Sequence, residues 1–187
     1  NDGDPDLFVS DQSAANALWR NDGTRFHRVV GEDPLALGGG IVGAAFSDYD
    51  NDGDLDLATT ALNPQSGGDQ LYQNLGSELM PVGALLGLSP GSSGRALSFA
   101  DYDGDGNADL LVADSRHSRL YRSMAAGSSW LQLDLQGPEF NRHALGARVE
   151  VMVGDDRQYR EIQSGYGYGS QVQPRVHFGL GVAAQVE

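Results

Sequence analysis

Two aspartate-rich segments hold the residues best suited to chemistry in this sequence. Asp48-Tyr-Asp-Asn-Asp-Gly-Asp-Leu-Asp-Leu57 and Asp101-Tyr-Asp-Gly-Asp-Gly-Asn-Ala-Asp-Leu110 match position for position. Hard cations bind oxygen, and Ca²⁺ takes roughly six to eight such ligands, which a short loop supplies when alternate side chains point inward. Gly53 stands at the sixth position, where a sharp turn needs backbone angles closed to other residues. The spacing therefore predicts a Ca²⁺ site in each loop.

The predicted ligands occupy alternate positions of each loop. In the first loop they are Asp48, Asp50, Asp52, the carbonyl of Asp54, and Asp56. In the second loop they are Asp101, Asp103, Asp105, Asn107 through its carbonyl, and Asp109. A truncated copy of the loop, Asn1-Asp-Gly-Asp-Pro-Asp-Leu7, adds Asp2, Asp4 and Asp6 as candidates, with two ligand positions missing.

The alternative is that these loops are plain solvated turns, because Asp, Asn and Gly favour turns without a metal. Against it, five carboxylates crowd into nine residues of the first loop and repel one another unless a cation lies between them. Mg²⁺ is the poorer candidate, since it keeps its waters and avoids cages made wholly of protein. Nor is this an EF-hand, whose loop needs a Glu at its twelfth position, where Thr59 or Val112 stands here.

The loops belong to a longer repeat. Leu18, Leu71 and Leu120 each begin a Leu-Trp/Tyr landmark, and the step from Leu18 to Asp48 equals the step from Leu71 to Asp101. Each period of about 50 residues holds about four short strand candidates, which is typical of a β-propeller blade. A β-solenoid or an open β-array is the alternative architecture.

The pattern stops after Met124, and Ala125–Ser129 has the composition of a flexible linker. Beyond it, apolar and polar residues alternate over 131–136 and 148–153, which indicates half-buried strands. Gly154-Asp155-Asp156 is predicted to be a hairpin turn. We therefore predict an all-β chain with a partial β-propeller of about three blades over residues 1–125. A small β-sandwich-like unit over residues 126–187 follows it.

The net charge and the lengths of the apolar runs limit the classes of partner that we expect. The 187 residues carry a formal net charge of −14, so phosphate backbones and anionic lipid surfaces are poor partners, and we expect no nucleic-acid binding. No apolar run approaches the roughly 18–20 residues of a membrane helix, so we expect no membrane insertion. The chain starts inside a motif without a Met, and we take it to be a segment of a longer protein.

At the aspartate loops the sequence resembles the FG-GAP (VCBS-type) repeats of integrin α-subunit propellers and of many secreted bacterial proteins. The resemblance covers roughly residues 1–125. It implies Ca²⁺ in the first hairpin of each blade, and usually seven blades in a ring.

The C-terminal part resembles the ASPIC/UnbV domain through Asn141–Val149, Gly165–Gln171 and Arg175–Gly181. That domain follows FG-GAP repeats in the cartilage acidic protein 1 family, and the order of modules is the same here. His143 stands where the resemblance leads us to expect an acidic residue. The resemblance implies an extracellular, cell-surface or periplasmic location and no particular reaction.

No catalytic constellation stands out. His27, His117, His143 and His177 are scattered without metal-ligand spacing. We therefore expect no enzyme, but a calcium-binding extracellular scaffold or adhesion-type protein that presents a surface for a protein or glycan. It could also be a component of a larger extracellular assembly, in which exposed strands complete a partner's sheet. The alternative is a secreted hydrolase or lyase whose active site lies in propeller parts outside this segment.

Overall fold

The regular structure of the described residues consists mainly of short antiparallel sheets. The computed structural model describes residues 3–11, 13–29, 40–76, 78–89, 91–125, 127–165, 167–183 and 185–186. Two 3-10 turns, η2 (Pro64–Ser66) and η3 (Glu139–Asn141), are the helical segments of this described part, and none of its helices is long and apolar enough to span a membrane. The strands are β1 (Leu7–Val9), β2 (Ala17–Asn21), β3 (Phe26–Arg28), β4 (Ile41–Ser47), β5 (Asp56–Ala61), β6 (Gln70–Asn74), β7 (Leu79–Pro81), β8 (Ala96–Ala100), β9 (Asp109–Ala113), β10 (Arg119–Tyr121), β11 (Ser129–Leu133), β12 (Arg148–Val153), β13 (Asp156–Glu161) and β14 (Val176–Gly181).

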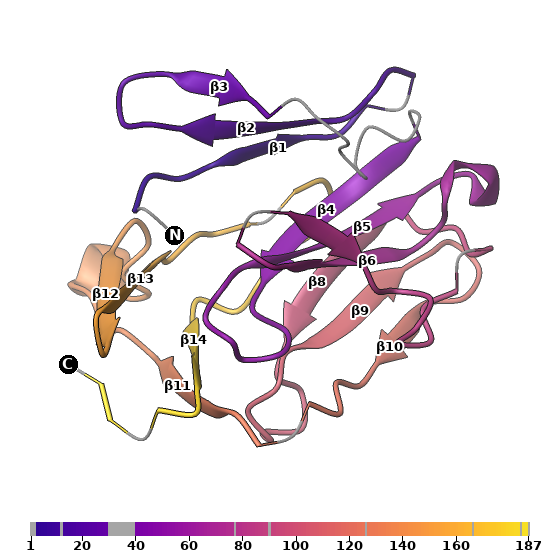
Figure 1. Ribbon diagram of the computed structural model, residues 1–187. Coiled ribbons are helices and arrows are strands. Elements are labelled where there is room, and N and C mark those ends of the chain that lie inside the picture. Colours follow the sequence, from indigo (N-terminus) through magenta and orange to yellow (C-terminus); the bar gives the residue numbers. More distant parts are fainter. Residues whose placement is uncertain are drawn as a thin grey trace.

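The repeat corresponds to blades. Strands β4-β5-β6-β7 form one four-stranded antiparallel sheet, flanked by the three-stranded sheets β1-β2-β3 and β8-β9-β10. β1, β5 and β9 each follow an aspartate loop, so the first sheet matches the last three strands of the complete blade and the third sheet its first three. In Figure 1 the sheets lie beside one another, with β1–β3 at the top. The predicted all-β, propeller-like fold is confirmed, and the described residues form neighbouring blades without closing a ring.

The middle blade is buried on both faces. Leu57 and Tyr72 pack towards Phe8 and Leu18 of the first blade, so this side of the sheet makes one core. On the opposite side, small residues such as Ala58 lie in a second core with β8 and β9. Every residue of β5 is buried, which explains why this strand lacks an alternation of apolar and polar side chains.

A buried ion pair links the second and third blades. Asp69, at 1% exposure, accepts from the Thr60 hydroxyl at 2.7 Å and from Nε of Arg119 at 3.0 Å. Arg119 belongs to β10 and also donates to the carbonyl of Ser93 at 2.8 Å. Because a buried carboxylate needs such partners, this pair aligns the two blades as well as joining them.

The C-terminal residues form two two-stranded sheets, β11-β14 and β12-β13. The predicted hairpin is confirmed, because Val153 pairs with Asp156 across a turn in which Gly154 has a φ of 64°. The sheets share a core built around Phe178 and Ile162, which are fully buried. In Figure 1 this unit lies against the ends of β4 and β8, where the aspartate loops begin.

Replacement of Leu57 by Ala is expected to lower the free energy of unfolding by about 2–5 kcal/mol, because it opens a cavity between the first two blades. Urea unfolding followed by tryptophan fluorescence measures this change. Leu85→Ala is the control, since Leu85 is 84% exposed, and it is expected to shift stability by less than about 0.5 kcal/mol. Equal effects of the two substitutions would contradict the interblade core.

Candidate metal centre

Each complete aspartate loop brings three carboxylates together. In the first loop, one oxygen from each of Asp48, Asp50 and Asp56 lies within 4.8 Å of the others. The second loop does the same with Asp101, Asp103 and Asp109. These are the first, third and ninth positions of the predicted ligand pattern, and each triad could hold a metal ion.

Backbone amides hold the ninth-position carboxylate of the first loop. Asp56 starts β5, and its two oxygens accept from the amide of Tyr49 at 3.0 Å and from the amide of Asn74 at 2.8 Å. The first contact closes the loop on itself, and the second ties the loop to the end of β6. The position of this carboxylate is therefore set by the blade rather than by neighbouring side chains.

The same arrangement recurs in the other two copies of the loop. Asp109 accepts from the amides of Tyr102 at 3.1 Å and Ser123 at 2.8 Å. Asp6 accepts from the amide of Asn21 at 2.8 Å, which is the counterpart of the contact to β6. The truncated loop thus keeps the blade contact of its last acid. Asp4 is half-buried, and Asp2 lies outside the described residues.

Asp48 at the first position carries an unsatisfied oxygen. Its Oδ2 accepts from the amides of Gly53 at 3.0 Å and Gly179 at 2.9 Å, whereas its buried Oδ1 has no hydrogen-bond donor among the described residues. The residue is 1% exposed. Burial raises the pKa of Asp48 to about 6 and that of Asp56 to about 8, because a charged carboxylate loses its hydration there. A cation beside Oδ1 would supply the missing partner, so the residues present fit a metal ion.

The equivalent residue of the second loop is more completely satisfied. Oδ1 of Asp101 accepts from the amides of Gly104 at 2.8 Å and Asp105 at 3.1 Å. Oδ2 accepts from the Gly106 amide and from Nε2 of Gln132, both at 3.0 Å. The two loops share their spacing but differ in how much of the charge the protein already compensates.

The fifth-position acids lie outside the triads. One oxygen of Asp52 accepts from the amide of Asp54 at 2.8 Å, and one of Asp105 accepts from the amide of Asn107 at 2.9 Å. Each side chain is therefore turned onto its own loop, and its place among the ligands stays a prediction. The same holds for the carbonyls of Asp54 and Asn107. The side-chain oxygen of Asn107 accepts a hydrogen bond from Nδ2 of Asn51, in the first loop, at 3.1 Å.

One repeat position that the sequence analysis missed faces the third-position acid. Gln73 donates from Nε2 to Asp50 at 2.7 Å. Arg122 holds the same place in the next blade and pairs with Asp103 at 2.6 Å and Asp105 at 3.0 Å. Both follow the Leu-Tyr landmark directly, so comparison of the repeats could have identified this position.

Asn51 is a second residue that the sequence analysis passed over as part of a turn. It is fully buried and has a φ of 60°, a conformation that Asn tolerates better than most residues. Its Nδ2 donates to the carbonyl of Gly106 at 3.2 Å, which joins the two loops. Its Oδ1 lies 2.6 Å from Nε2 of His177 in the C-terminal unit. Only a long-range fold contact could show this role.

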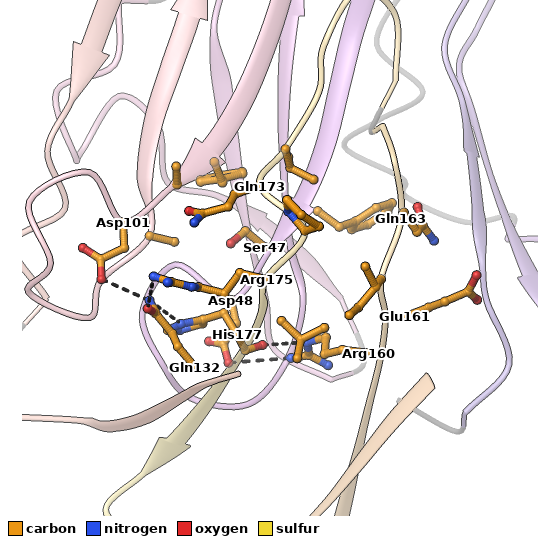
Figure 2. A pocket seen from close by; sticks show the side chains of 18 of the residues that line it. Ser47, Asp48, Asp101, Gln132, Arg160, Glu161, Gln163, Gln173, Arg175 and His177 are labelled. Carbon is orange, nitrogen blue, oxygen red and sulfur yellow. Dashed lines mark hydrogen bonds and ion pairs between the residues drawn. The ribbon is translucent and has the colours of Figure 1, made fainter. Parts of the chain in front are cut away.

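The C-terminal unit meets both loops around a cavity of about 110 Å³. Figure 2 shows Asp48 and Asp101 from the loops facing Gln132, Arg160 and His177. Burial, and secondarily the nearby Arg160, lower the pKa of His177 to about 4, so its ring is neutral at pH 7. His177, which the sequence left without a role, is thus a contact between the two parts of the chain.

Comparison with known proteins agrees with this architecture. Residues 1–59 match the family described as FG-GAP-like repeat, and residues 137–187 match the family described as ASPIC and UnbV. The second complete loop lies outside the matched segments, yet it repeats the contacts of the first.

Similar proteins share the name cartilage acidic protein 1. The human protein (Homo sapiens) is 28% identical over 154 residues, which cover 72% of this chain and 22% of the relative. The mouse protein (Mus musculus) is also 28% identical over 154 residues, covering 72% of this chain and 23% of the relative. The Xenopus tropicalis protein is 30% identical over 98 residues, covering 49% of this chain and 15% of the relative. The chain thus spans about a fifth of the length of these relatives. Both resemblances drawn from the motifs are confirmed for the matched residues: residues 1–59 are similar to an FG-GAP-like repeat, and residues 137–187 are similar to ASPIC and UnbV.

Proposed function

We propose that the two complete loops bind Ca²⁺ and that the ions stabilise the blades rather than take part in a reaction. The observation that carries this proposal is the buried Oδ1 of Asp48, which lacks a donor although it belongs to a carboxylate triad. An unpaired buried carboxylate oxygen is costly, and a divalent ion held by Asp48, Asp50 and Asp56 would remove that cost.

Calcium suits these loops better than magnesium. The candidate ligands are all oxygens, and in each site they come from one short loop whose residues differ in exposure. Ca²⁺ accepts such irregular shells at about 2.3–2.6 Å, whereas Mg²⁺ demands a near-ideal octahedron and retains water.

An architectural role follows from the partners of the ligands. Asp56 and Asp109 each accept one amide from their own loop and one from Asn74 or Ser123, at or just after the end of the next strand, so an ion at each triad would strengthen the tie between the loop and that strand. The carboxylates are engaged in holding the hairpins, which leaves them unsuited to proton transfer. We therefore propose a non-enzymatic role for this segment.

We further propose that the segment is part of an extracellular scaffold or adhesion-type protein that presents a surface to a protein or glycan. The similarity to proteins named for cartilage supports this location, as does the resemblance to integrin-type and secreted repeats. Extracellular Ca²⁺ modules work with dissociation constants of about 10⁻⁴–10⁻³ M, so a modest affinity of these loops would suffice there.

The two sites are not expected to be equal. In the first loop a neutral Gln73 faces the triad, whereas Arg122 already places a positive charge on Asp103 and Asp105. Asp101 also lacks the unsatisfied oxygen that Asp48 carries. The first loop is therefore the stronger candidate for tight binding.

Calcium is expected to raise the melting temperature of the chain, and a chelator is expected to lower it. A ligand that binds only the folded state stabilises it by about 2.7 kcal/mol at a hundredfold excess over its Kd. Scanning calorimetry with the double variant Asp50→Asn/Asp103→Asn should show most of this response lost, because each triad loses one charge. Asp155→Asn, in the exposed hairpin turn, is the control and should respond like the unmodified chain. A melting temperature indifferent to Ca²⁺ and chelator would rule out the metal sites.

Exchanging the charge that faces each triad is expected to shift the affinity of that site. A unit charge about 6 Å from a divalent ion in water costs about 1.4 kcal/mol, or about tenfold in affinity. Gln73→Arg should weaken the first site by roughly that factor, and Arg122→Gln should strengthen the second. Calcium titration calorimetry measures both changes. Arg116→Gln removes an exposed charge at the opposite end of β9 and should change neither site, so an equal effect from it would point to net charge alone.

A further inference from the structure

Strand β14 of the C-terminal unit lies directly on the first aspartate loop. The amide of Gly179 donates to Oδ2 of Asp48 at 2.9 Å, and the amide of Gly181 donates to the carbonyl of Asn51 at 2.9 Å. The second bond joins the backbone of β14 to the backbone of the loop. Backbone amides of β14 thus bond to the first loop, more than a hundred residues away in the sequence, at and beside the candidate ligand Asp48.

Glycines on both sides make this close approach possible. A Cβ at Gly179 would lie 2.3 Å from Oδ2 of Asp48 and 2.4 Å from Cα of Asn51, so no side chain fits there. On the loop side, a Cβ at Gly53 would lie 2.6 Å from Nε2 of Gln158. Gln158 in turn donates to the carbonyl of Gly179 at 2.7 Å, which fixes β14 in place. The loop and β14 are therefore closely packed, and a hydrogen bond from Gln158 holds β14 in this position.

Asp48 is the residue at which docking and the metal triad meet. Its Oδ2 is occupied by the Gly53 and Gly179 amides, with the Arg160 guanidinium at 3.8 Å. Its Oδ1 is the oxygen left without a donor. Since hydrogen bonds to the distal atom of a ligand orient the ligating atom, β14 determines which way Oδ1 points.

We infer that the C-terminal unit forms the outer shell of the first metal site, so that docking of β14 and cation binding in the loop strengthen each other. This inference rests on the proposed calcium binding. It adds that the C-terminal unit takes part in it, with Gly179 as a positioning residue for Asp48. Arg160 reaches the same oxygen and the carbonyl of Gly53 at 3.3 Å, but one guanidinium cannot balance the five carboxylates of the loop. A divalent ion and the docked unit therefore act together, and their coupling is reciprocal.

The second loop receives a weaker version of the same support. Gln132 donates from a flexible side chain to Asp101, whereas Gly179 donates from the backbone of a paired strand. Gly106 lies under Trp130, whose ring would collide with any Cβ at that position. The C-terminal unit thus contacts both loops, and its effect on cation binding is expected to be larger at the first loop.

The test is calcium titration calorimetry of the full chain in an Asp103→Asn background, which leaves the first site to be observed. Gly179→Ala is expected to weaken calcium binding about 10–100-fold, as the loss of an outer-shell partner does elsewhere. Gly91→Ala is the matched control, because an added Cβ there meets nothing within 4 Å and the affinity should stay within about twofold.

Hydrogen exchange in the same Asp103→Asn background, in which β9 no longer borders a complete triad, supplies a second readout that does not depend on the Gly179 variant. Calcium is expected to slow exchange of the Gly179 and Gly181 amides at least about tenfold more than exchange of the β9 amides. Asp50→Asn should abolish that difference. An equal gain in both strands would mean general stabilisation and would overturn the coupling.

The outcomes separate the two proposals. Absence of any calcium binding by the unmodified chain defeats the proposed function. Calcium binding with a folded Gly179→Ala variant of unchanged affinity defeats only the role of the C-terminal unit. If Gly179→Ala does not fold, the exchange comparison between Gly179, Gly181 and β9 decides the matter.

Discussion

Burial of negative charge at the ends of β4 and β8 is the constraint on which the rest of the structure depends. Asp48 and Asp56 lie almost completely inside the protein, and their pKa values are raised because water is excluded. Charged groups are buried at such cost only when donors or a cation compensate them. The strand ends, the glycine turns and the C-terminal unit all supply such donors, and one oxygen of Asp48 is left without one among the described residues.

Compensation comes largely from backbone amides, which ties the site to the fold. In both complete loops the ninth-position acid accepts one amide from its own loop and one from a residue at or just after the end of the neighbouring strand. A blade that formed with a different register would leave those acids without donors. The same contacts that hold the hairpins together therefore also set the geometry of the triads.

The C-terminal unit forms part of this arrangement. Its contacts fall on Asn51 and Asp48, two of the most deeply buried residues of the first loop. Asn51 also bonds to the carbonyl of Gly106, so one side chain joins two blades and the following unit. The contact between the two parts of the chain thus has a physical basis, because the C-terminal unit supplies hydrogen-bond partners to buried polar groups of the first loop.

Local spacing was enough to predict the aspartate loops, the blade repeat and the C-terminal hairpin. Alternate Asp positions, a Gly at the turn and a constant step between landmarks act over a few residues, and such patterns are visible in one sequence. Contacts across the molecule left no comparable pattern. Gly179, Asn51 and His177 are ordinary strand or turn residues by sequence, and only folding places them at the loop.

The sequence alone determined which residue types gather at the candidate metal centre, because the acidic residues of each loop are close along the chain. Tertiary structure decided which of them converge, turning Asp52 and Asp105 onto their own loops while Asp56 and Asp109 face the triads. It also decided that Asp48 and Asp101, identical in the repeat, have different partners. The reason is that solvation and hydrogen-bond donors arrive from distant strands, and no local pattern encodes their position.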